Sequence, residues 1–274
     1  MVSRPSVMGI FKIRIALTET EEVEVEQVGY VESQKISYFQ VDGNRIMTPA
    51  ALFSDLQEVA INHSDFLGYT VDFLTERKLG WVIINCHLQV IRMPKLGERI
   101  TIQTWCEKCR KMQAIRCFYV LDENEEIIMK AISRWIFMDL ENRKPTNIPE
   151  EMVLKYRSER ESSIPGEKFL MPKESKDEVA ITRSLLITRR DTDTNGHANN
   201  VKYLEWAMDD VPDEIYDDMK LKDVQVVYRK ECVRGDEVIM KTYIRDDKDH
   251  GKEVITFITD KEQAVLAQVV TLWR

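Results

Sequence analysis

Polar side chains that can do chemistry concentrate in one short stretch of the chain. Six of them fall within ten residues: Asp191, Asp193, Asn195, His197, Asn199 and Asn200. Because side chains alternate across an extended backbone, we expect Asp193, Asn195 and His197 to face the same way. An acid, an amide and an imidazole on one side of a loop can move protons and polarise a carbonyl.

The segments on either side of this loop predict a strand and a helix. Residues 180–188 form an apolar run typical of a strand, and Val201, Leu204 and Met208 recur at the three- and four-residue spacing of one helix face. Asn199 and Asn200 are both favoured N-cap residues. The sequence therefore predicts a polar loop between a strand and a helix that starts near residue 200.

Size and composition exclude several classes of protein. The chain has 274 residues, 43% of them hydrophobic and 31% charged, as in an ordinary globular protein. No stretch approaches the roughly 20 apolar residues of a membrane span. A net charge of −8 argues against nucleic acid as the main partner. The five cysteines are an odd count, and no signal peptide is evident, which indicates reduced thiols in the cytoplasm.

No cofactor or metal ion is predicted. Cys106-x-x-Cys109 has no second thiol pair at zinc spacing, and the chain has no phosphate-cradling glycine loop or dinucleotide fingerprint. His63 lies on the apolar stripe of a predicted helix, where a histidine is more often a core residue than a ligand.

The chain repeats one pattern of elements. The first half has a predicted strand (35–41), a helix starting at Thr48-Pro49, and β-rich runs at 81–88, 99–106, 113–121 and 126–138. The second half has the strand 180–188, a helix over 200–210, and runs at 223–228, 237–244, 253–259 and 263–273. Residues 88–100 also parallel residues 226–238, with Gly97 opposite Gly235. The chain is therefore an internal duplication.

The duplication predicts an α+β fold of two tandem units, each a long helix wrapped by an antiparallel sheet. We expect the first unit at 1–145, a linker at 146–179 with a short helix near 150–156, and the second unit at 180–274. An extra strand or arm is expected within 9–31, and a seam between the units could hold a long apolar ligand.

The two halves differ where the polar loop lies. In the predicted alignment, Ile46 to Thr48 stand opposite Asn195 to His197, and Met93-Pro94 stands opposite Glu231-Cys232. The first half therefore lacks the polar constellation. We expect one catalytic site per chain, in the second half.

Residues 193–206 (DTNGHANNVKYLEW) resemble the D-x-N-x-H-x-N-N-x-x-Y motif of acyl-acyl-carrier-protein thioesterases. Glu231-Cys232 stands 34 positions after His197, as the Glu-Cys pair of that family does. Residues 56–63 resemble the family's first helix and residues 148–150 its inter-domain stretch, and the duplicated unit resembles the hot-dog fold. The resemblance runs from about residue 9 to the C-terminus, and the lack of a transit peptide favours a bacterial member.

The resemblance implies hydrolysis of long- or medium-chain acyl-acyl carrier protein to a free fatty acid. We expect Glu231 to be the general base that activates water, with His197 and Asn195 orienting the water and the thioester carbonyl. Asp193 would fix the His197 ring by a hydrogen bond, and the start of helix 200–210 would add oxyanion donors. His197 as the base, with Glu231 holding the water, is an equal alternative.

Other mechanisms and functions compete with this one. Cys232 beside a His and an Asn could form a covalent acyl-enzyme, although the adjacent Glu231 offers a direct route for water. No G-x-S-x-G elbow is present, which disfavours a serine hydrolase. Asn199 and Asn200 fit capping better than catalysis, and Asp191 fits bracing. An acyl-coenzyme A thioesterase and a non-catalytic acyl-binding protein are the alternative functions.

Two further sets of residues are expected to contact the substrate. The apolar first helix would shape the acyl pocket, through Leu52, Phe53, Leu56 and Val59. Acyl carrier protein is acidic, as the resemblance implies, so it would dock on the basic residues that flank the loop: Arg189, Arg190, Lys202, Arg229 and Lys230. The duplicated chain is expected to be a monomer or a homodimer.

Overall fold

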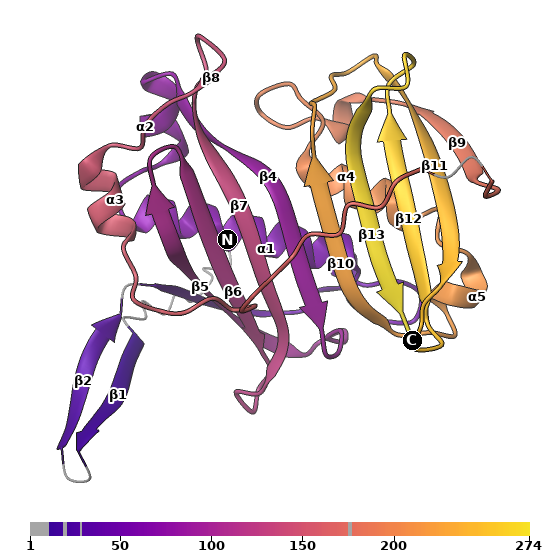
Figure 1. The fold of residues 1–274 in the computed structure, drawn as a ribbon. Coiled ribbons are helices and arrows are strands. Elements are labelled where there is room, and N and C mark those ends of the chain that lie inside the picture. Colours follow the sequence, from indigo (N-terminus) through magenta and orange to yellow (C-terminus); the bar gives the residue numbers. More distant parts are fainter. Residues whose placement is uncertain (1–10, 19–20, 28, 175–176) are drawn as a thin grey trace.

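The fold is built on one long antiparallel sheet. The structure is a computed structural model that describes residues 11–18, 21–27, 29–174 and 177–274. Within these residues eleven strands form a single sheet in the order β3-β5-β6-β7-β4-β10-β13-β12-β11-β9, with β8 paired to β7. A separate hairpin of β1 and β2 stands apart from it, as Figure 1 shows.

The element bounds are as follows. The hairpin and the strands of the first half are β1 (Phe11–Thr18), β2 (Glu21–Gln27), β3 (Tyr30–Lys35), β4 (Leu79–Val90), β5 (Arg99–Arg110), β6 (Gln113–Leu121), β7 (Ile127–Asp139) and β8 (Lys144–Pro145). The strands of the second half are β9 (Ile181–Leu186), β10 (Leu221–Tyr228), β11 (Glu237–Asp246), β12 (Lys252–Thr259) and β13 (Val265–Trp273). The α-helices are α1 (Pro49–Phe66), α2 (Val71–Glu76), α3 (Glu150–Tyr156), α4 (Asn200–Met208) and α5 (Asp213–Tyr216).

Each half of the sheet covers one helix whose start is fixed by a side-chain cap. Thr48 Oγ1 accepts a hydrogen bond from the Ala51 N–H at 3.2 Å, and Pro49 occupies the first turn of α1. Asn199 Oδ1 accepts one from the Val201 N–H at 3.0 Å at the start of α4. Both predicted helix starts are confirmed, and each half has the arrangement expected of a hot-dog unit.

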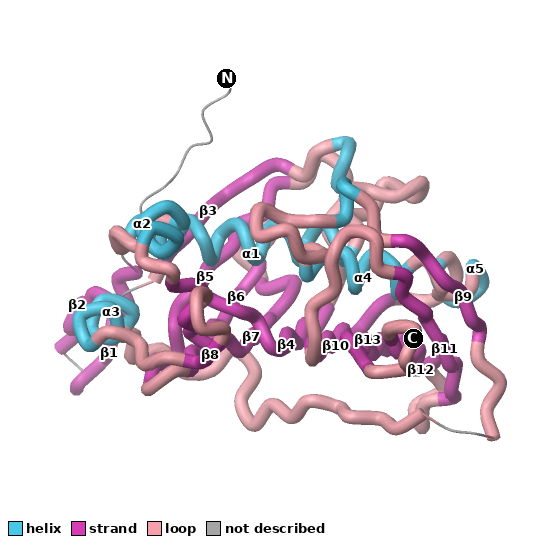
Figure 2. The backbone as a smooth tube through the Cα atoms, turned by 90° about the horizontal axis from the view of Figure 1, so that it is seen from above, coloured by secondary structure: helices cyan, strands magenta, loops and turns pink. Residues whose placement is uncertain are grey.

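The two halves join edge to edge through β4 and β10. These strands pair antiparallel, from Asp223 opposite Gln89 to Val227 opposite Asn85. Figure 2 shows α1 and α4 together on one side of the joined sheet, and one hydrophobic core contains residues of both helices. The expected seam is therefore closed by backbone pairing on the sheet side. A hollow of about 580 Å³ lies between the first turn of α1 and the face of α4 that carries Val201, Glu205 and Met208.

The segment between the halves runs along the opposite side of the sheet from the helices (Figure 2). Its buried Glu167 accepts a hydrogen bond from Arg134 of β7, with Nη2 to Oε2 at 2.5 Å. Farther along, Leu170 N–H donates to Oε1 of Gln225 in β10 at 2.7 Å. The segment thus contacts both halves across their junction.

Several local predictions need correction. The strand expected at 35–41 ends at Lys35 and is followed by a 3₁₀ helix, Tyr38–Gln40, because Gln40 Oε1 accepts from the Ser37 N–H and hydroxyl. The short helices α2 and α5 were not expected. The helix predicted at 150–156 is confirmed as α3, and the arm expected within 9–31 is confirmed as the β1–β2 hairpin over the described residues.

Candidate active site

The predicted polar loop is a compact turn held by two carboxylates. Asp191 is buried, and its Oδ2 accepts hydrogen bonds from the Thr188 N–H at 2.8 Å and from the Thr188 hydroxyl. Asp193 Oδ1 accepts from the Asn195 N–H at 2.8 Å and the His197 N–H at 3.2 Å. The bracing role predicted for Asp191 is confirmed, and Asp193 has a similar role.

The loop is not extended, which corrects the expectation that Asp193, Asn195 and His197 face one way. The Asp193 N–H donates to the His197 carbonyl at 2.8 Å, and Gly196 has φ of 80°, a left-handed conformation that glycine adopts without steric cost. The chain therefore reverses between residues 193 and 197. The Asp193 carboxylate is committed to the backbone of this turn, so the expected hydrogen bond from Asp193 to the His197 ring is wrong.

The His197 ring contacts Glu231 instead. Nδ1 of His197 lies 3.1 Å from Oε2 of Glu231, and the other oxygen of Glu231 accepts a hydrogen bond from Arg143 Nη2. The imidazole is 34% exposed and the carboxylate 46%, so water reaches both. Of the predicted catalytic residues, His197 and Glu231 are brought together, and we call this pair the dyad.

Backbone contacts explain how two residues so far apart in sequence meet. The Ala198 N–H donates to the Cys232 carbonyl at 2.8 Å, and His197 forms a β-bridge with Val233. The loop before α4 is thereby paired with the segment that follows β10. His197 and Glu231 each lie beside this pairing.

Cys232 lies behind the pair, in the core. Its side chain is buried, with Sγ 3.1 Å from the Tyr203 hydroxyl oxygen. Burial raises the pKa of the Cys232 thiol, which disfavours the thiolate that a nucleophile needs. The geometry favours water over the covalent route.

The three asparagines of the loop occupy different places. Asn195 is exposed at the tip of the turn, and Asn199 is the N-cap of α4. The Asn200 carbonyl accepts a hydrogen bond from the Tyr228 hydroxyl at 2.8 Å. The predicted capping by Asn199 is confirmed, and Asn200 braces the helix start against β10.

The first half contains the same turn without the imidazole. Asp42 Oδ1 accepts from the Asn44 N–H at 2.9 Å and the Ile46 N–H at 3.0 Å, as Asp193 does in the second half. Ile46 thus stands where His197 stands, and the predicted alignment of 46–48 with 195–197 is two residues off. That alignment misses that the aspartate and the first asparagine of the loop are duplicated.

The segment opposite each turn also corresponds. The Met47 N–H donates to the Pro94 carbonyl at 2.9 Å, as the Ala198 N–H donates to Cys232. Pro94 therefore matches Cys232 and Met93 matches Glu231, which confirms the predicted pairing. With isoleucine and methionine in place of the imidazole and the carboxylate, the first half cannot form a second dyad.

The apolar residues predicted to shape an acyl pocket are all buried on α1: Leu52, Phe53, Leu56 and Val59. They belong to the shared core. The hollow between α1 and α4 is lined by Ala50 and Ala51 instead. A smaller pocket of about 70 Å³ lies near the other end of α1, beside Ala60 and Trp81.

Arg116 lines that smaller pocket and was missed in the sequence. It is buried, with Nη1 2.8 Å from Nδ1 of His63 and 3.2 Å from Thr104 Oγ1. Burial, aided by the Arg116 charge, lowers the pKa of His63 to about 2, so its ring is neutral. The expectation of a core histidine is confirmed. The signal was available, because Arg116 lies in phase with Ala114 and Phe118, whose buried side chains share its strand face.

The basic residues around the loop divide into two groups. Lys202 pairs with Glu205 at 2.7 Å and Lys230 with Asp260 at 2.9 Å, which partly neutralises them. The other three predicted residues are exposed and have no acidic partner among the described residues: Arg189, Arg190 and Arg229.

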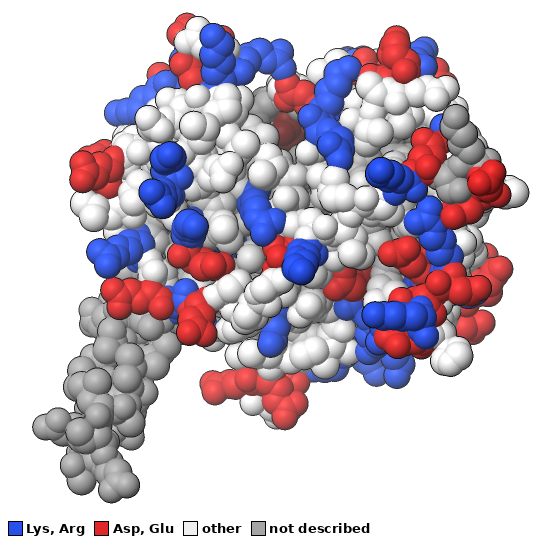
Figure 3. Space-filling model, in the orientation of Figure 1, with Lys and Arg blue, Asp and Glu red and all other residues white. Residues whose placement is uncertain are grey.

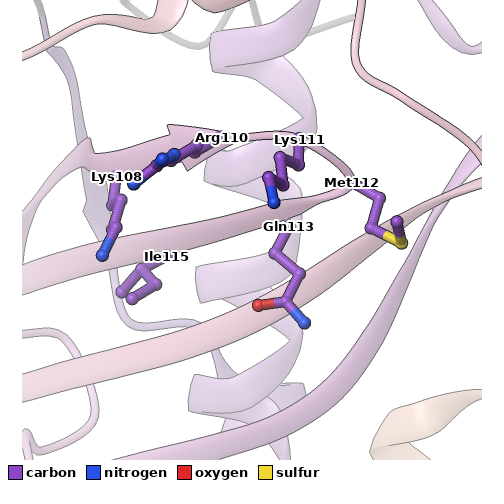
Figure 4. Close-up of a pocket in the computed structure, with 6 residues that line it drawn as sticks. All are labelled: Lys108, Arg110, Lys111, Met112, Gln113 and Ile115. Atoms are coloured by element: carbon purple, nitrogen blue, oxygen red, sulfur yellow. The ribbon is translucent and has the colours of Figure 1, made fainter.

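A second group of cations lies on the first half. A pocket of about 420 Å³ on the β5–β6 hairpin is lined by Lys108, Arg110 and Lys111, together with Met112, Gln113 and Ile115 (Figure 4). None of the three cations has an ion-pair partner within the part of the chain that the structure describes. Figure 3 shows further Lys and Arg side chains along the upper edge of the first half, where β8 lies in Figure 1.

Over the described ranges, no group of three or more His, Cys, Asp or Glu side chains could hold a metal ion. In the same residues, no helix has the length and apolar character needed to cross a membrane.

Comparison with known families shows which family the chain belongs to. The family model of the acyl-ACP thioesterase N-terminal domain matches residues 27–156, and that of the C-terminal domain matches residues 174–274. The chain belongs to the acyl-ACP thioesterase family. Within this family's two domains, the dyad lies in the part matched by the C-terminal model.

Solved structures confirm the double hot-dog fold. An acyl-ACP thioesterase from Bacteroides thetaiotaomicron is 24% identical, with a TM-score of 0.78 over 90% of this chain and 98% of that one. The 12:0-ACP thioesterase from Umbellularia californica is 22% identical, also with a TM-score of 0.78, over 90% and 97% of the two chains.

Plant relatives are similar over most of the chain. A chloroplastic acyl-[acyl-carrier-protein] hydrolase of Cuphea viscosissima is 28% identical over 82% of this chain and 57% of its own length. The oleoyl-acyl carrier protein thioesterase 2 of Arabidopsis thaliana is 29% identical over 76% and 60%. The chain spans about 60% of the length of these relatives.

Proposed function

We propose that this protein hydrolyses long- or medium-chain acyl-acyl carrier protein to a free fatty acid and the carrier thiol. The observation that carries the proposal is the 3.1 Å contact between His197 Nδ1 and Glu231 Oε2, in a member of the acyl-ACP thioesterase family. An imidazole held by a carboxylate and reached by water is suited to activating water against a thioester.

The contact favours His197 as the base, the alternative left open by the sequence. If Glu231 accepts the Nδ1 proton, Nε2 carries the lone pair that removes a proton from water. The hydroxide attacks the thioester carbonyl carbon, and the tetrahedral oxyanion forms. Its collapse breaks the C–S bond, and the imidazolium Nε2–H returns its proton to the leaving thiolate.

The other loop residues support this step in the proposal. Backbone N–H groups at the start of α4 stabilise the oxyanion, helped by the positive end of the helix dipole. Asn195, at the exposed tip of the turn, orients the water or the carbonyl. Asp193 acts indirectly, by holding the backbone that carries His197.

The test is release of free thiol from acyl-carrier protein over a range of chain lengths. His197→Ala and Glu231→Ala should each lower kcat by about 10²- to 10⁴-fold, the range of a lost general base. Retention of near-wild-type turnover in either variant would remove that residue from the mechanism.

The same assay separates the alternatives. An acyl-coenzyme A thioesterase would prefer coenzyme A substrates, and a non-catalytic acyl-binding protein would bind acyl chains without turnover. We propose that the first unit, with Leu52, Phe53, Leu56 and Val59 as its buried helix face, shapes the acyl pocket. The second unit does the chemistry, in a cytoplasmic monomer or homodimer.

We further propose that the acidic carrier protein docks on the exposed arginines that flank the loop: Arg189, Arg190 and Arg229. With a net charge of −8, the enzyme repels an acidic partner at long range, and screening limits that repulsion to about 10 Å at 0.1 M salt. Arg189, Arg190 and Arg229 have no acidic partner within the described residues, whereas Lys202 and Lys230 contribute less because they are paired. The hairpin cluster of Lys108, Arg110 and Lys111 extends this surface onto the first half.

Charge reversal tests the docking surface. Changing Arg189, Arg190 and Arg229 together to Glu should raise KM for acyl-carrier protein about tenfold, the result of losing roughly 1.4 kcal/mol of binding free energy. Turnover of acyl-coenzyme A should be unchanged. Lys248→Glu is the control, because Lys248 is exposed in the β11–β12 turn. That turn lies at the opposite end of the strands from the proposed site. Because the control reverses one charge and the triple variant reverses three, a control effect of about a third of that binding free energy would show that only net charge matters.

A further inference from the structure

Arg143 reaches the proposed site from the other half of the molecule. It lies in the turn between β7 and β8, and its Nη2 donates a hydrogen bond to Oε1 of Glu231, which follows β10. The second oxygen of the same carboxylate faces Nδ1 of His197 at 3.1 Å. Glu231 is therefore held on one side by the first unit and on the other by the second.

The topology of the sheet explains why these two residues meet. Strands β7 and β10 both pair antiparallel with β4, so they run parallel to each other. Their C-terminal ends therefore lie at the same end of the sheet. The turn that carries Arg143 and the segment that carries Glu231 both begin at that end of the sheet. The joining of the two units through β4 and β10 is thus what brings the guanidinium to the carboxylate.

The turn holds Arg143 in a defined place. Asp139 accepts hydrogen bonds from the N–H and the side-chain amide of Asn142, both at 2.9 Å. The Leu140 N–H donates to the Lys78 carbonyl at 2.8 Å, and the backbones of Asp139 and Lys144 stand opposite each other in the β7–β8 register. The Arg143 backbone has φ of 52°, in the left-handed region. An arginine presented from a braced turn loses less freedom on pairing than one on a loose loop.

We infer that Arg143 is a positioning residue of the thioesterase site, contributed by the first unit, that orients Glu231 toward His197. The inference rests on the proposed function. With one oxygen bonded to the guanidinium, the carboxylate presents the other to the imidazole, which fixes the ring and its tautomer. The site is therefore shared by both units, although the residues that touch the reacting atoms come from the second.

The experiment compares Arg143→Ala with two other variants. Alanine carries the same left-handed backbone cost as arginine, so the change removes only the side chain. We expect kcat to fall about tenfold while KM for acyl-carrier protein stays within about twofold, as for a lost orienting contact. Arg143→Lys should recover part of the loss. Lys144→Ala, which removes the exposed cation next to Arg143 at the start of β8, should match the wild type.

A second background separates orientation of Glu231 from other roles. In Glu231→Gln, the further change Arg143→Ala should cause no additional loss of kcat, because Arg143 acts through the carboxylate. The thermal midpoint should not move, since an exposed ion pair adds little stability. Wild-type kcat in Arg143→Ala, or losses that multiply in the double variant, would overturn the inference. The proposed function fails by a different result, full activity in His197→Ala.

Discussion

Two histidines of this chain differ in what surrounds the ring. His197 is 34% exposed and faces the carboxylate of Glu231, which offers an acceptor for a ring proton. His63 is fully buried and faces the guanidinium of Arg116 at 2.8 Å. A ring beside a carboxylate and open to water can exchange protons, whereas a ring beside a buried cation must stay neutral. The same side chain is thus suited to chemistry in one place and to packing in the other.

The buried histidine predicts a specific acid sensitivity. The folded pKa of His63 is about 2 and its ordinary value is 6.5, so below pH 6.5 the unfolded chain binds a proton that the folded chain does not. Stability is unaffected by this group above pH 6.5 and falls as the pH drops below it. Glutamine does not titrate. Between pH 7.5 and pH 5.5, the free energy of unfolding of His63→Gln should therefore fall by about 1.4 kcal/mol less than that of the wild type. Urea denaturation at both pH values measures it, and equal losses would contradict the prediction.

Cys232 gives a prediction about the nucleophile. Its thiol is buried against the Tyr203 hydroxyl and its pKa is raised by burial. Cys232→Ala should therefore keep kcat within a few fold of wild type, because a buried thiol with a raised pKa is a poor nucleophile. Mass spectrometry of the quenched wild-type enzyme should show no acyl adduct. An acyl group on Cys232 would establish the covalent route.

At the scale of the element, the carboxylate-braced turn occurs twice with different contents. Asp42 and Asp193 each accept two backbone N–H bonds, but only the second turn ends in a histidine. The brace is therefore a property of the turn, and the chemistry is added to it. The first turn therefore serves as an internal control for the second.

Alanine at each aspartate separates the two roles. Asp193→Ala and Asp42→Ala should each lower the free energy of unfolding by about 1–2 kcal/mol, because two N–H donors lose their acceptor. Only Asp193→Ala should also lower kcat, since only that turn carries His197. Unfolding by urea and thiol release on both variants check this. Loss of activity in Asp42→Ala at a concentration where it is folded would contradict it.

The helices and most strands were predictable because their signals are local. A Thr-Pro start and an Asn cap mark α1 and α4, and alternating apolar residues mark the sheet. The strand at 35–41 failed because Ser37 and Gln40 offer the backbone a competing hydrogen-bonded turn. Helices of four to six residues, such as α2 and α5, are too short for periodicity to show.

The site was predicted in part. The loop motif and its resemblance pointed to His197 and Glu231, which the structure places in contact. The prediction of an extended loop was wrong because the Asp193 carboxylate accepts hydrogen bonds from the backbone of its own loop. The spacing of the polar residues does not reveal such bonds. Arg143 was missed because its contact depends on which strand β4 pairs with, and such long-range pairing has no local signal.

At the scale of the whole molecule, a buried polar cluster secures the junction of the two units. Glu167 of the linker is almost fully buried and accepts from Arg134 of β7. His87 of β4 lies between that carboxylate, with Nδ1 to Oε1 at 3.6 Å, and Asp223 of β10, with Nε2 to Oδ2 at 2.7 Å. Four segments of the chain, namely the linker, β7, β4 and β10, thus meet at the seam. Removing one member leaves buried groups without partners.

The linker predicts a measurable contribution to stability. Glu167→Gln should lower the free energy of unfolding by about 2 kcal/mol, because Arg134 and His87 lose the charge they face in a buried setting. Glu159→Gln is the matched control in the same linker, since Glu159 is 72% exposed and its ion pair with Arg157 adds little. Chemical denaturation of both variants decides it. Equal stability of the two would show that the linker is a passive tether.

Two similar units are fused in one chain, and only one of them carries the dyad. This arrangement affects how the protein can evolve. In a symmetric pair of identical chains, one codon encodes both copies, so any change to the helix beneath the acyl chain also alters the helix behind the dyad. Here Ile46 and His197 occupy matching places but separate codons. If α1 shapes the acyl pocket, as proposed, mutations along it alter which substrate fits while the loop before α4 keeps the proposed dyad. Under the proposed function, substrate selectivity and reactivity are thereby inherited as independent traits.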